Sequence, residues 1–494
     1  MGKIFTKKSK KHYINVGISL SILLIFQFLP APAPITHCGM MVLGCLFSFL
    51  YLIATDDCNW PIFLIIWFLA FYTTDIFPGS GSSGMDISVL KSFGNSSVLF
   101  IICTLLLCNI LEESGLLRRI AVWFISRKFA KKGAWSFTLM LIAATLVIAS
   151  FMDPVPAAVV MISVAKEIFQ TLGFKKGDSW PMMVICMIPW ASVLGFAATP
   201  IGHNLPIAIM GMVEQMSGAR VNIVNYMIVG IPIVLVVWIL MFLYFRFVVK
   251  PDLSMFDNID YSALDSLKVG KMDTKEKLAA VAGLFTLILW VFPGLITFSA
   301  PDSKAAKLFG NVHILFPLLI SLVVLAIIHI DGEKMFDFEV SSKKISWSAV
   351  YLLAGNLLMA AAIGSDTTGI PQWLTANIGP IMGKFSPMML ILLVVFLCVS
   401  LTNLLNNWSV AVVMTTVAVP IVIEKGVNPA ILGVLIPLCC NCAFPTPAAT
   451  PVTAFSVSDP YCNPQYVLKH GISMAIITLI VALILGYPLA SIAF

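Results

Sequence analysis

Two tetrapeptides occur twice in this chain, in the same order in each half. AVVM stands at residues 158–161 and again at 411–414, and AATP stands at 197–200 and again at 448–451. Both motifs lie where polar or helix-breaking residues interrupt long apolar stretches. Interrupted backbone inside a bilayer leaves N–H and C=O groups without partners, which is tolerated only where they line a cavity or bind an ion. Paired interruptions at matching positions therefore indicate a binding site near the middle of a membrane.

The composition is that of a membrane protein. Of the 494 residues, 59% are hydrophobic and 11% are charged, whereas about 25% are charged in a typical soluble domain. We predict an all-α polytopic membrane protein with about eleven transmembrane helices and two re-entrant hairpins, arranged as two inverted repeats. The spans are expected near residues 13–30, 36–54, 59–77, 96–111, 180–216 (broken), 224–248, 277–298, 312–330, 347–364, 430–465 (broken) and 470–492.

Positive charge is distributed unevenly between the two sides of this predicted topology. With the N-terminus inside, 24 of the 30 Lys and Arg fall in inner segments. The outer side has six, which are Lys91, Arg220, Lys304, Lys307, Lys384 and Lys425. Because Lys and Arg accumulate in cytoplasmic loops, we expect a multi-pass protein of the cell (inner) membrane with a cytoplasmic N-terminus and an external C-terminus. The lipid bilayer then explains the net charge of +6 without nucleic acid as a partner.

The chain divides into four expected parts. The first apolar segment follows a basic start but has no clear small-residue cleavage site, so we interpret it as a retained helix. The parts are the N-terminal scaffold helices (1–95), a first repeat (96–250) with a re-entrant hairpin at 136–170 and a broken helix at 180–216, a cytoplasmic linker (251–276), and a second repeat (277–494) with a re-entrant hairpin at 386–423 and a broken helix at 430–465.

The two repeats are predicted to have opposite orientations. A polar, Gly-containing turn precedes each hairpin, at residues 111–116 in the first half and 364–370 in the second. Between the turn and the hairpin lies an amphipathic stretch, which contains Trp123 in the first half and Trp373 in the second. Counting spans places the first stretch inside and the second outside, as in many secondary transporters built from inverted repeats.

These residues resemble the divalent anion:sodium symporter (DASS) family of dicarboxylate, citrate and sulfate carriers. The similar segments are LEESGLLRRIAVWFISR (111–127), the two hairpin tips, GFAATPIGHN (195–204) and CAFPTPAATPVTAF (442–455), and the resemblance runs from about residue 40 to the end of the chain. It implies a homodimer whose transport part moves as an elevator against a scaffold part. It also implies that the hairpin tips and the helix breaks form the sites for a small anionic substrate and for Na⁺.

The resemblance implies a specific set of site residues. In the family each tip holds a Ser-Asn-Thr motif, but here the tips read Asp153-Pro154-Val155 and Asn406-Asn407-Trp408, so that only Asn407 matches. The implied substrate-binding residues are Val155, Pro200, Ile201, Asn407, Trp408, Pro451 and Val452. The implied cation-coupling residues are Asp153, Ser150, Gly202, Thr402, Asn406, Ala449 and Thr450, with Na⁺ expected at Asp153, Asn406 and Asn407.

The most informative of these residues is Asp153. A carboxylate at bilayer depth costs at least ~2.5 kcal/mol and needs a partner or a proton, so Asp153 can coordinate Na⁺, carry a proton or pair with a cationic group. The alternative is a helix N-cap, with Pro154 as the first helical residue. Asn406 and Asn407 likewise offer oxygen ligands or caps. Trp408 either narrows the cavity or packs in the core, and His203 either donates to an anion or packs as a neutral ring.

Other classes of function find little support. The cluster Cys439-Cys440-Asn441-Cys442 could suggest a metal site, but adjacent helical residues point about 100° apart, which favours packing. The chain has no nucleotide-binding or hydrolase motif in a suitable context, so we expect a transporter rather than an enzyme and no cofactor besides Na⁺. The expected function is secondary active transport of di- or tricarboxylates, coupled to Na⁺, to H⁺ or to anion exchange. The alternatives are a Na⁺/H⁺ antiporter that uses Asp153, a membrane-embedded enzyme, or a non-transporting membrane sensor.

Overall fold

The structure is a computed structural model. It describes residues 7–55, 60–79, 81–201, 204–254, 256, 270–300, 303–304, 313–382, 385–403, 405–446 and 450–494. Nearly all regular structure in these ranges is helical. A two-residue antiparallel hairpin of β1 (His329–Ile330) and β2 (Glu333–Lys334) turns through Asp331 and Gly332, which both have positive φ. The prediction of an all-α polytopic membrane protein is confirmed.

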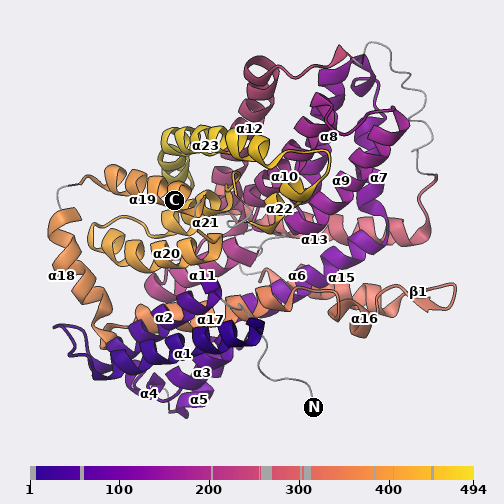
Figure 1. Ribbon diagram of the computed structural model, residues 1–494. Coiled ribbons are helices and arrows are strands. Elements are labelled where there is room, and N and C mark those ends of the chain that lie inside the picture. The colour runs from indigo at the N-terminus through magenta and orange to yellow at the C-terminus, as the bar shows by residue number, and fades with distance from the viewer. Residues whose placement is uncertain are drawn as a thin grey trace.

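The N-terminal helices gather at one end of the molecule, at the bottom of Figure 1. The span expected at 59–77 is two helices rather than one, because the chain turns at residues 70–72. The helices are α1 (Lys7–Phe28), α2 (His37–Thr55), α3 (Pro61–Leu69), α4 (Thr73–Ile76) and α5 (Gly84–Lys91).

Of the next part of the chain, α7, α8 and α9 lie at the opposite end of the molecule, at the upper right of Figure 1, whereas α6 and α11 lie in its middle. The hairpin of this part consists of α8 and α9, and the span that follows is interrupted between α10 and α11. The elements are α6 (Ser96–Glu113), α7 (Leu116–Ile125), η1 (Ala130–Lys132), α8 (Ala134–Ala149), α9 (Pro154–Thr171), α10 (Ser179–Ala198), α11 (Asn204–Ser217), α12 (Ile223–Tyr244) and the π-helical turn η2 (Phe245–Val249).

The last part contains a second hairpin, α19 and α20, followed by a second interrupted span, α21 and α22. Most of the expected linker at 251–276 lies outside the described residues, and the helix that follows it begins at a capping box between Asp273 and Glu276. The elements are α13 (Thr274–Ser299), α15 (Leu315–Ile327), α16 (Phe338–Ser342), α17 (Trp347–Ile363), η5 (Asp366–Thr368), α18 (Ile370–Met382), α19 (Pro387–Thr402), α20 (Asn407–Glu424), α21 (Ala430–Asn441), α22 (Pro451–Ser458) and α23 (Pro464–Ala493).

The described residues include seven helices that are long and apolar enough to cross a bilayer, and further apolar helices of 10–17 residues. Burial separates central helices from peripheral ones. In the apolar stretch of α10, 94% of the residues are buried inside the protein, whereas in that of α23 only 28% are buried. Helix α10 packs on α8 and α9, and α21 packs on α19 and α20, so each interrupted span lies against its own hairpin. Helices α10 and α21 also contact each other in the core.

Candidate functional site

The two hairpin tips have the same local construction. In the first, Ser150 ends α8, and the Asp153 side chain caps α9 by accepting a hydrogen bond from the backbone N–H of Val155 at 2.9 Å. In the second, Asn403 ends α19, and Asn406 caps α20 by accepting from the N–H of Trp408 at 2.9 Å. Short polar side chains are the preferred N-caps. Asp153 and Asn406 therefore occupy equivalent backbone positions, and only Asp153 has an ionisable side chain.

The two helix breaks share the same backbone at the repeated threonine. Thr199 and Thr450, the third residues of the two AATP motifs, both have extended backbone, with φ −136° and ψ 150° for Thr199 and φ −144° and ψ 136° for Thr450. Each precedes a proline, and a residue before proline disfavours helical backbone. The first copy of the motif ends α10 at Ala198, whereas the second copy lies after the end of α21 at Asn441 and starts α22 at Pro451.

A threonine from each break binds the adjoining tip. The hydroxyl of Thr199 donates to the backbone carbonyl of Ser150, and the hydroxyl of Thr446 donates to the backbone carbonyl of Asn403 at 3.3 Å. The Asn403 side chain in turn accepts from the N–H of Phe444 at 3.2 Å. These bonds satisfy backbone groups that the helix ends leave without partners, and they hold tip and break together.

Both tips and the second break meet at one cavity of about 430 Å³. Seven of the residues expected from the sequence line it, which are Asp153, Val155, Asn406, Asn407, Trp408, Thr450 and Val452. The N-termini of α9, α20 and α22 lie at this cavity, because Val155, Trp408 and Val452 belong to the first turns of these helices. A helix N-terminus carries partial positive charge and free N–H groups, which suit an anion.

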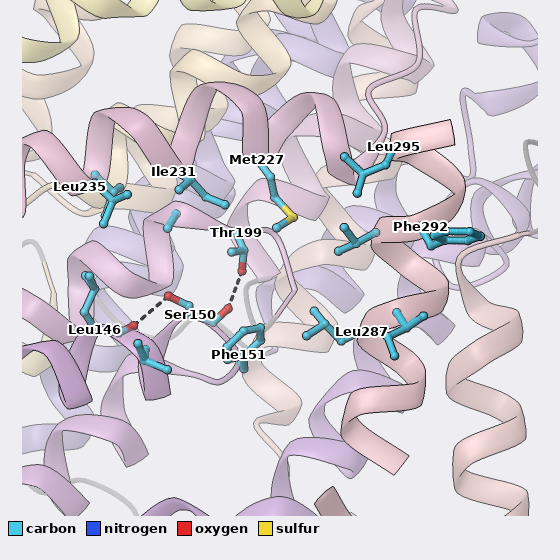
Figure 2. Close-up of a pocket in the computed structure, with 15 residues that line it drawn as sticks. Leu146, Ser150, Phe151, Thr199, Met227, Ile231, Leu235, Leu287, Phe292 and Leu295 are labelled. Atoms are coloured by element: carbon cyan, nitrogen blue, oxygen red, sulfur yellow. Dashed lines mark hydrogen bonds between the residues drawn. The ribbon is translucent and has the colours of Figure 1, made fainter. Parts of the chain in front are cut away.

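The remaining expected residues lie elsewhere. Ser150 lies with Thr199 on the far side of the first tip, in an apolar groove of about 560 Å³ between α8, α12 and α13, where its hydroxyl donates to the carbonyl of Leu146 at 2.8 Å (Figure 2). Ile201 is buried beside a separate apolar cavity with Trp290. Pro200 is buried and lines neither space. Gly202, His203 and Ala449 lie outside the described residues, and Pro451 is described only as the first residue of α22.

Thr402 lies outside the cavity lining and contacts the lining residue Asn407. It is fully buried, and its hydroxyl contacts the side-chain oxygen of Asn407 at 2.7 Å and the backbone carbonyl of Cys440. The single Thr402 proton can go to only one of these two oxygens. When it goes to Asn407, the Asn407 oxygen is occupied and the NH₂ group of that amide is available to an acceptor in the cavity.

The sequence analysis missed six polar or charged residues of the cavity. They are Cys108, Asn109, Glu112, Lys344, Ser346 and Asn441. Asn441 is only 3% exposed, and its side-chain nitrogen has no hydrogen-bond partner among the described residues. An unpaired buried donor is unfavourable, which is consistent with a donor that awaits an anion. The sequence signal was the position of Asn441, a polar residue at the end of an apolar helix and just before the second break.

The three cysteines of the cluster at residues 439–442 are part of the core. Cys439, Cys440 and Cys442 are each at most 1% exposed, and their backbone and side chains contribute to the packing of α21. Among the described residues, no group of three or more His, Cys, Asp and Glu side chains is arranged to hold a metal ion.

Comparisons with known proteins agree with this architecture. The sodium-dependent dicarboxylate transporter SdcS of Staphylococcus saprophyticus is 22% identical over 450 residues, covering 86% of this chain and 84% of the relative. The protein of the same name from Staphylococcus aureus (strain bovine RF122) is 22% identical over 457 residues, again covering 86% of this chain and 84% of the relative. These relatives confirm the resemblance predicted from the sequence.

A solved structure has the same fold. The crystal structure of the YdaH transporter of Alcanivorax borkumensis, described as having an unusual topology, matches 87% of this chain and 97% of its own with a TM-score of 0.54 at 15% sequence identity. The family model described as citrate transporter matches residues 22–436. The chain therefore belongs to the citrate transporter family, and it is a transporter rather than an enzyme.

Proposed function

We propose that this protein is a secondary active transporter of di- or tricarboxylates coupled to Na⁺. The observation that carries the proposal is the cavity shared by the two tips, with Asp153 and Asn406 as equivalent caps and three helix N-termini around one space. A cavity of about 430 Å³ is within the range of small-molecule sites.

The anion is assigned to the donor groups. In this proposal the Asn407 amide and the first turns of α9, α20 and α22 bind carboxylate oxygens, and Trp408 and Val452 limit the size of the ligand. Hydrogen bonds to a desolvated carboxylate are stronger than those between neutral groups, so few such contacts are needed for affinity.

The cation is assigned to the oxygen atoms near Asp153. Asp153 and Glu112 both line the cavity, and Lys344 is the only Lys or Arg among the lining residues that the structure describes. With both acids ionised the lining has an excess of negative charge, which opposes an anion unless a cation or proton enters with it. The similar proteins are named sodium-dependent, and oxygen atoms of Asp153, Asn406 and Thr450 are ligands that suit Na⁺.

The movement is assigned to the hairpins. In this proposal the hairpins and broken helices travel together as an elevator against scaffold helices, in a homodimer in the cell membrane. Ser150, Thr402 and the breaks at Pro200 and Ile201 then act as supports or cation contacts of the moving part. The inverted relation of the two repeats supplies the alternating access that a carrier needs.

Uptake by purified protein in proteoliposomes tests the function. We expect counterflow of radiolabelled citrate or succinate that requires external Na⁺. Na⁺ movement without carboxylate counterflow would identify an antiporter instead, and an absence of both fluxes would identify a sensor. Uptake driven equally well by a proton gradient in Na⁺-free buffer would transfer the coupling role to H⁺.

Selectivity tests the substrate assignment. Trp408→Thr should enlarge the cavity and shift preference toward bulkier or more highly charged carboxylates, whereas Asn407→Ala should raise the KM of every carboxylate about tenfold or more, because a hydrogen bond to a charged group is lost. Competition by succinate, citrate, tartrate and sulfate measures both changes. If Trp408→Thr keeps the wild-type order of substrate preference and Asn407→Ala keeps the wild-type KM, the second tip does not contact the substrate.

A further inference from the structure

The mouth of the cavity contains a lysine that no motif of the sequence pointed to. Lys344 lies between α16 and α17 and lines the cavity together with Ile345 and Ser346. Ile345 is buried at 6% exposure and anchors this segment. The side-chain nitrogen of Asn109 donates to the carbonyl of Ser341 at 3.4 Å, which ties the same segment to the last turns of α6.

The Lys344 ammonium has an exchangeable partner. Its Nζ lies 2.6 Å from Oε1 of Glu113, and the two side chains are 53% and 44% exposed. Exposed ion pairs contribute little to stability because water and salt screen them. Lys344 can therefore leave Glu113 at small cost when another carboxylate reaches the mouth.

The adjacent carboxylates make such a cation necessary. Glu112 lines the cavity beside Lys344, and Asp153 lies farther along the same lining. A dicarboxylate that enters past Glu112 meets a like charge, and Lys344 is the basic side chain placed to offset it. Ion pairs at the rim of a site act mainly on association rate and on salt dependence.

We propose that Lys344 is a substrate-recruiting residue that exchanges its ion pair with Glu113 for a pair with one carboxylate of the entering substrate. The proposal rests on the proposed function, and it adds a specificity residue at the mouth of that cavity. It also gives Glu113 a function, as a competitor of the substrate. Glu113 pairs with Lys344 when the cavity is empty and pairs with it again when the substrate departs.

Lys343 provides a matched control. It neighbours Lys344 in sequence, but its Nζ pairs with Oε1 of Glu339 at 2.9 Å, with side chains 70% and 82% exposed, and it is not among the lining residues. Lys343→Gln removes the same charge from the same short segment without altering the cavity. A difference between the two variants therefore reports on position and not on net charge.

Initial rates of succinate and citrate uptake in proteoliposomes test the recruitment. We expect Lys344→Gln to raise KM about fivefold and to flatten the decrease of uptake with added choline chloride at constant Na⁺. Lys344→Arg should keep the wild-type salt dependence, and Lys343→Gln should match the wild type. Equal KM and salt dependence in Lys344→Gln and Lys343→Gln would overturn the proposal.

A double-mutant cycle tests the exchange itself. Glu113→Gln should lower KM when Lys344 is present, because the competitor is lost, and should have little effect in the Lys344→Gln background. An equal decrease in both backgrounds would mean that Glu113 acts only as a negative charge, and the exchange would be wrong. Wild-type uptake in these assays keeps the proposed function intact even if the exchange fails, whereas a wild type that transports no carboxylate overturns the function and the exchange with it.

Discussion

Asp153 and Asn406 have the same structural position and differ in their ability to ionise. Both side chains cap a helix at a hairpin tip, through hydrogen bonds of 2.9 Å to the second residue of the helix. The cap on α9 uses Oδ1 of Asp153, so the cap does not need its second oxygen. Asparagine and aspartate are equally good N-caps, which means that the negative charge of Asp153 is not required for folding.

Replacing Asp153 by asparagine therefore removes the charge but keeps the helix cap, and tests the role of the charge alone. Asp153→Asn should leave the melting temperature in detergent unchanged and should remove or strongly weaken the Na⁺ or pH dependence of uptake. Asp153→Ala, which loses the cap as well, should also destabilise the protein by ~1 kcal/mol. Unchanged Na⁺ and pH dependence in the Asn variant would reduce Asp153 to a cap.

Asn441 presents the opposite situation, a polar group without a structural partner. Its side-chain nitrogen is buried and unpaired among the described residues. Asn441→Leu, which keeps the branched shape, should not destabilise the protein, because an unsatisfied donor disappears. It should raise the KM for carboxylates about tenfold or more, because a donor to a charged group is lost.

Stability and affinity measured on the same preparation distinguish the two roles of Asn441. A large loss of thermal stability with wild-type KM would mean that the amide is structural and that its partner lies in a part of the chain outside the described residues. Asn109, which also lines the cavity but already donates to Ser341, is the comparison residue.

At the scale of elements, the tips depend on hydrogen bonds from the breaks. The Thr199 hydroxyl binds the backbone carbonyl of Ser150, so the contact depends on the side chain of Thr199 and not on that of Ser150 (Figure 2). The Ser150 hydroxyl binds within its own helix, at Leu146. The two hydroxyl groups lie close together, but only that of Thr199 joins the tip to the break.

Removing each hydroxyl in turn should affect the stability of the protein to different degrees. Thr199→Val should destabilise the protein by about 1–3 kcal/mol, because it leaves a buried carbonyl without its donor, and should slow uptake. Ser150→Ala should be nearly neutral for stability. Thermal unfolding in detergent measures both variants, and equal stability of the two would contradict the coupling of tip and break. A loss of Na⁺ dependence in Ser150→Ala would instead support the cation role expected for that residue.

At the scale of the whole molecule, orientation follows from the charge pattern. The inner segments of the predicted topology include Arg118, Arg119 and Lys344, and the mouth of the cavity lies beside Lys344. If the prediction is correct, the cavity in this conformation opens toward the cytoplasm. The Lys and Arg distribution thus connects the topology with the state of the transport cycle.

Fusion proteins test this orientation. Alkaline phosphatase fused after Phe494 should be active, because the C-terminus is expected outside, and green fluorescent protein at the same position should be dark. A fusion in the linker at residues 257–269 should give the reverse result. Fluorescence at both positions would require an even number of membrane crossings between them and would invert the second repeat relative to our prediction.

The sequence by itself determined the class, the helices and the positions of the interruptions. Apolar length and periodicity are local properties, and Pro, Asp and Asn break or cap a helix through contacts within a few residues, so 151–156 and 405–409 could be identified without a structure. The span expected at 59–77 was wrong for the same reason. The stretch is mostly apolar, and its composition did not reveal the turn at residues 70–72.

Only the tertiary structure decided which residues share the cavity. Cys108 and Glu112 are 333 and 329 residues from Asn441 in sequence, and their juxtaposition with it depends on how α6 and α21 pack around the tips. The ion pair between Lys166 and Asp459, with Asp459 only 5% exposed in its side chain, joins distant parts of the chain in the same way. The partner of a side chain is set by long-range packing, which local sequence does not encode, and for this reason Lys344 emerged from the structure whereas Asp153 was evident from the sequence.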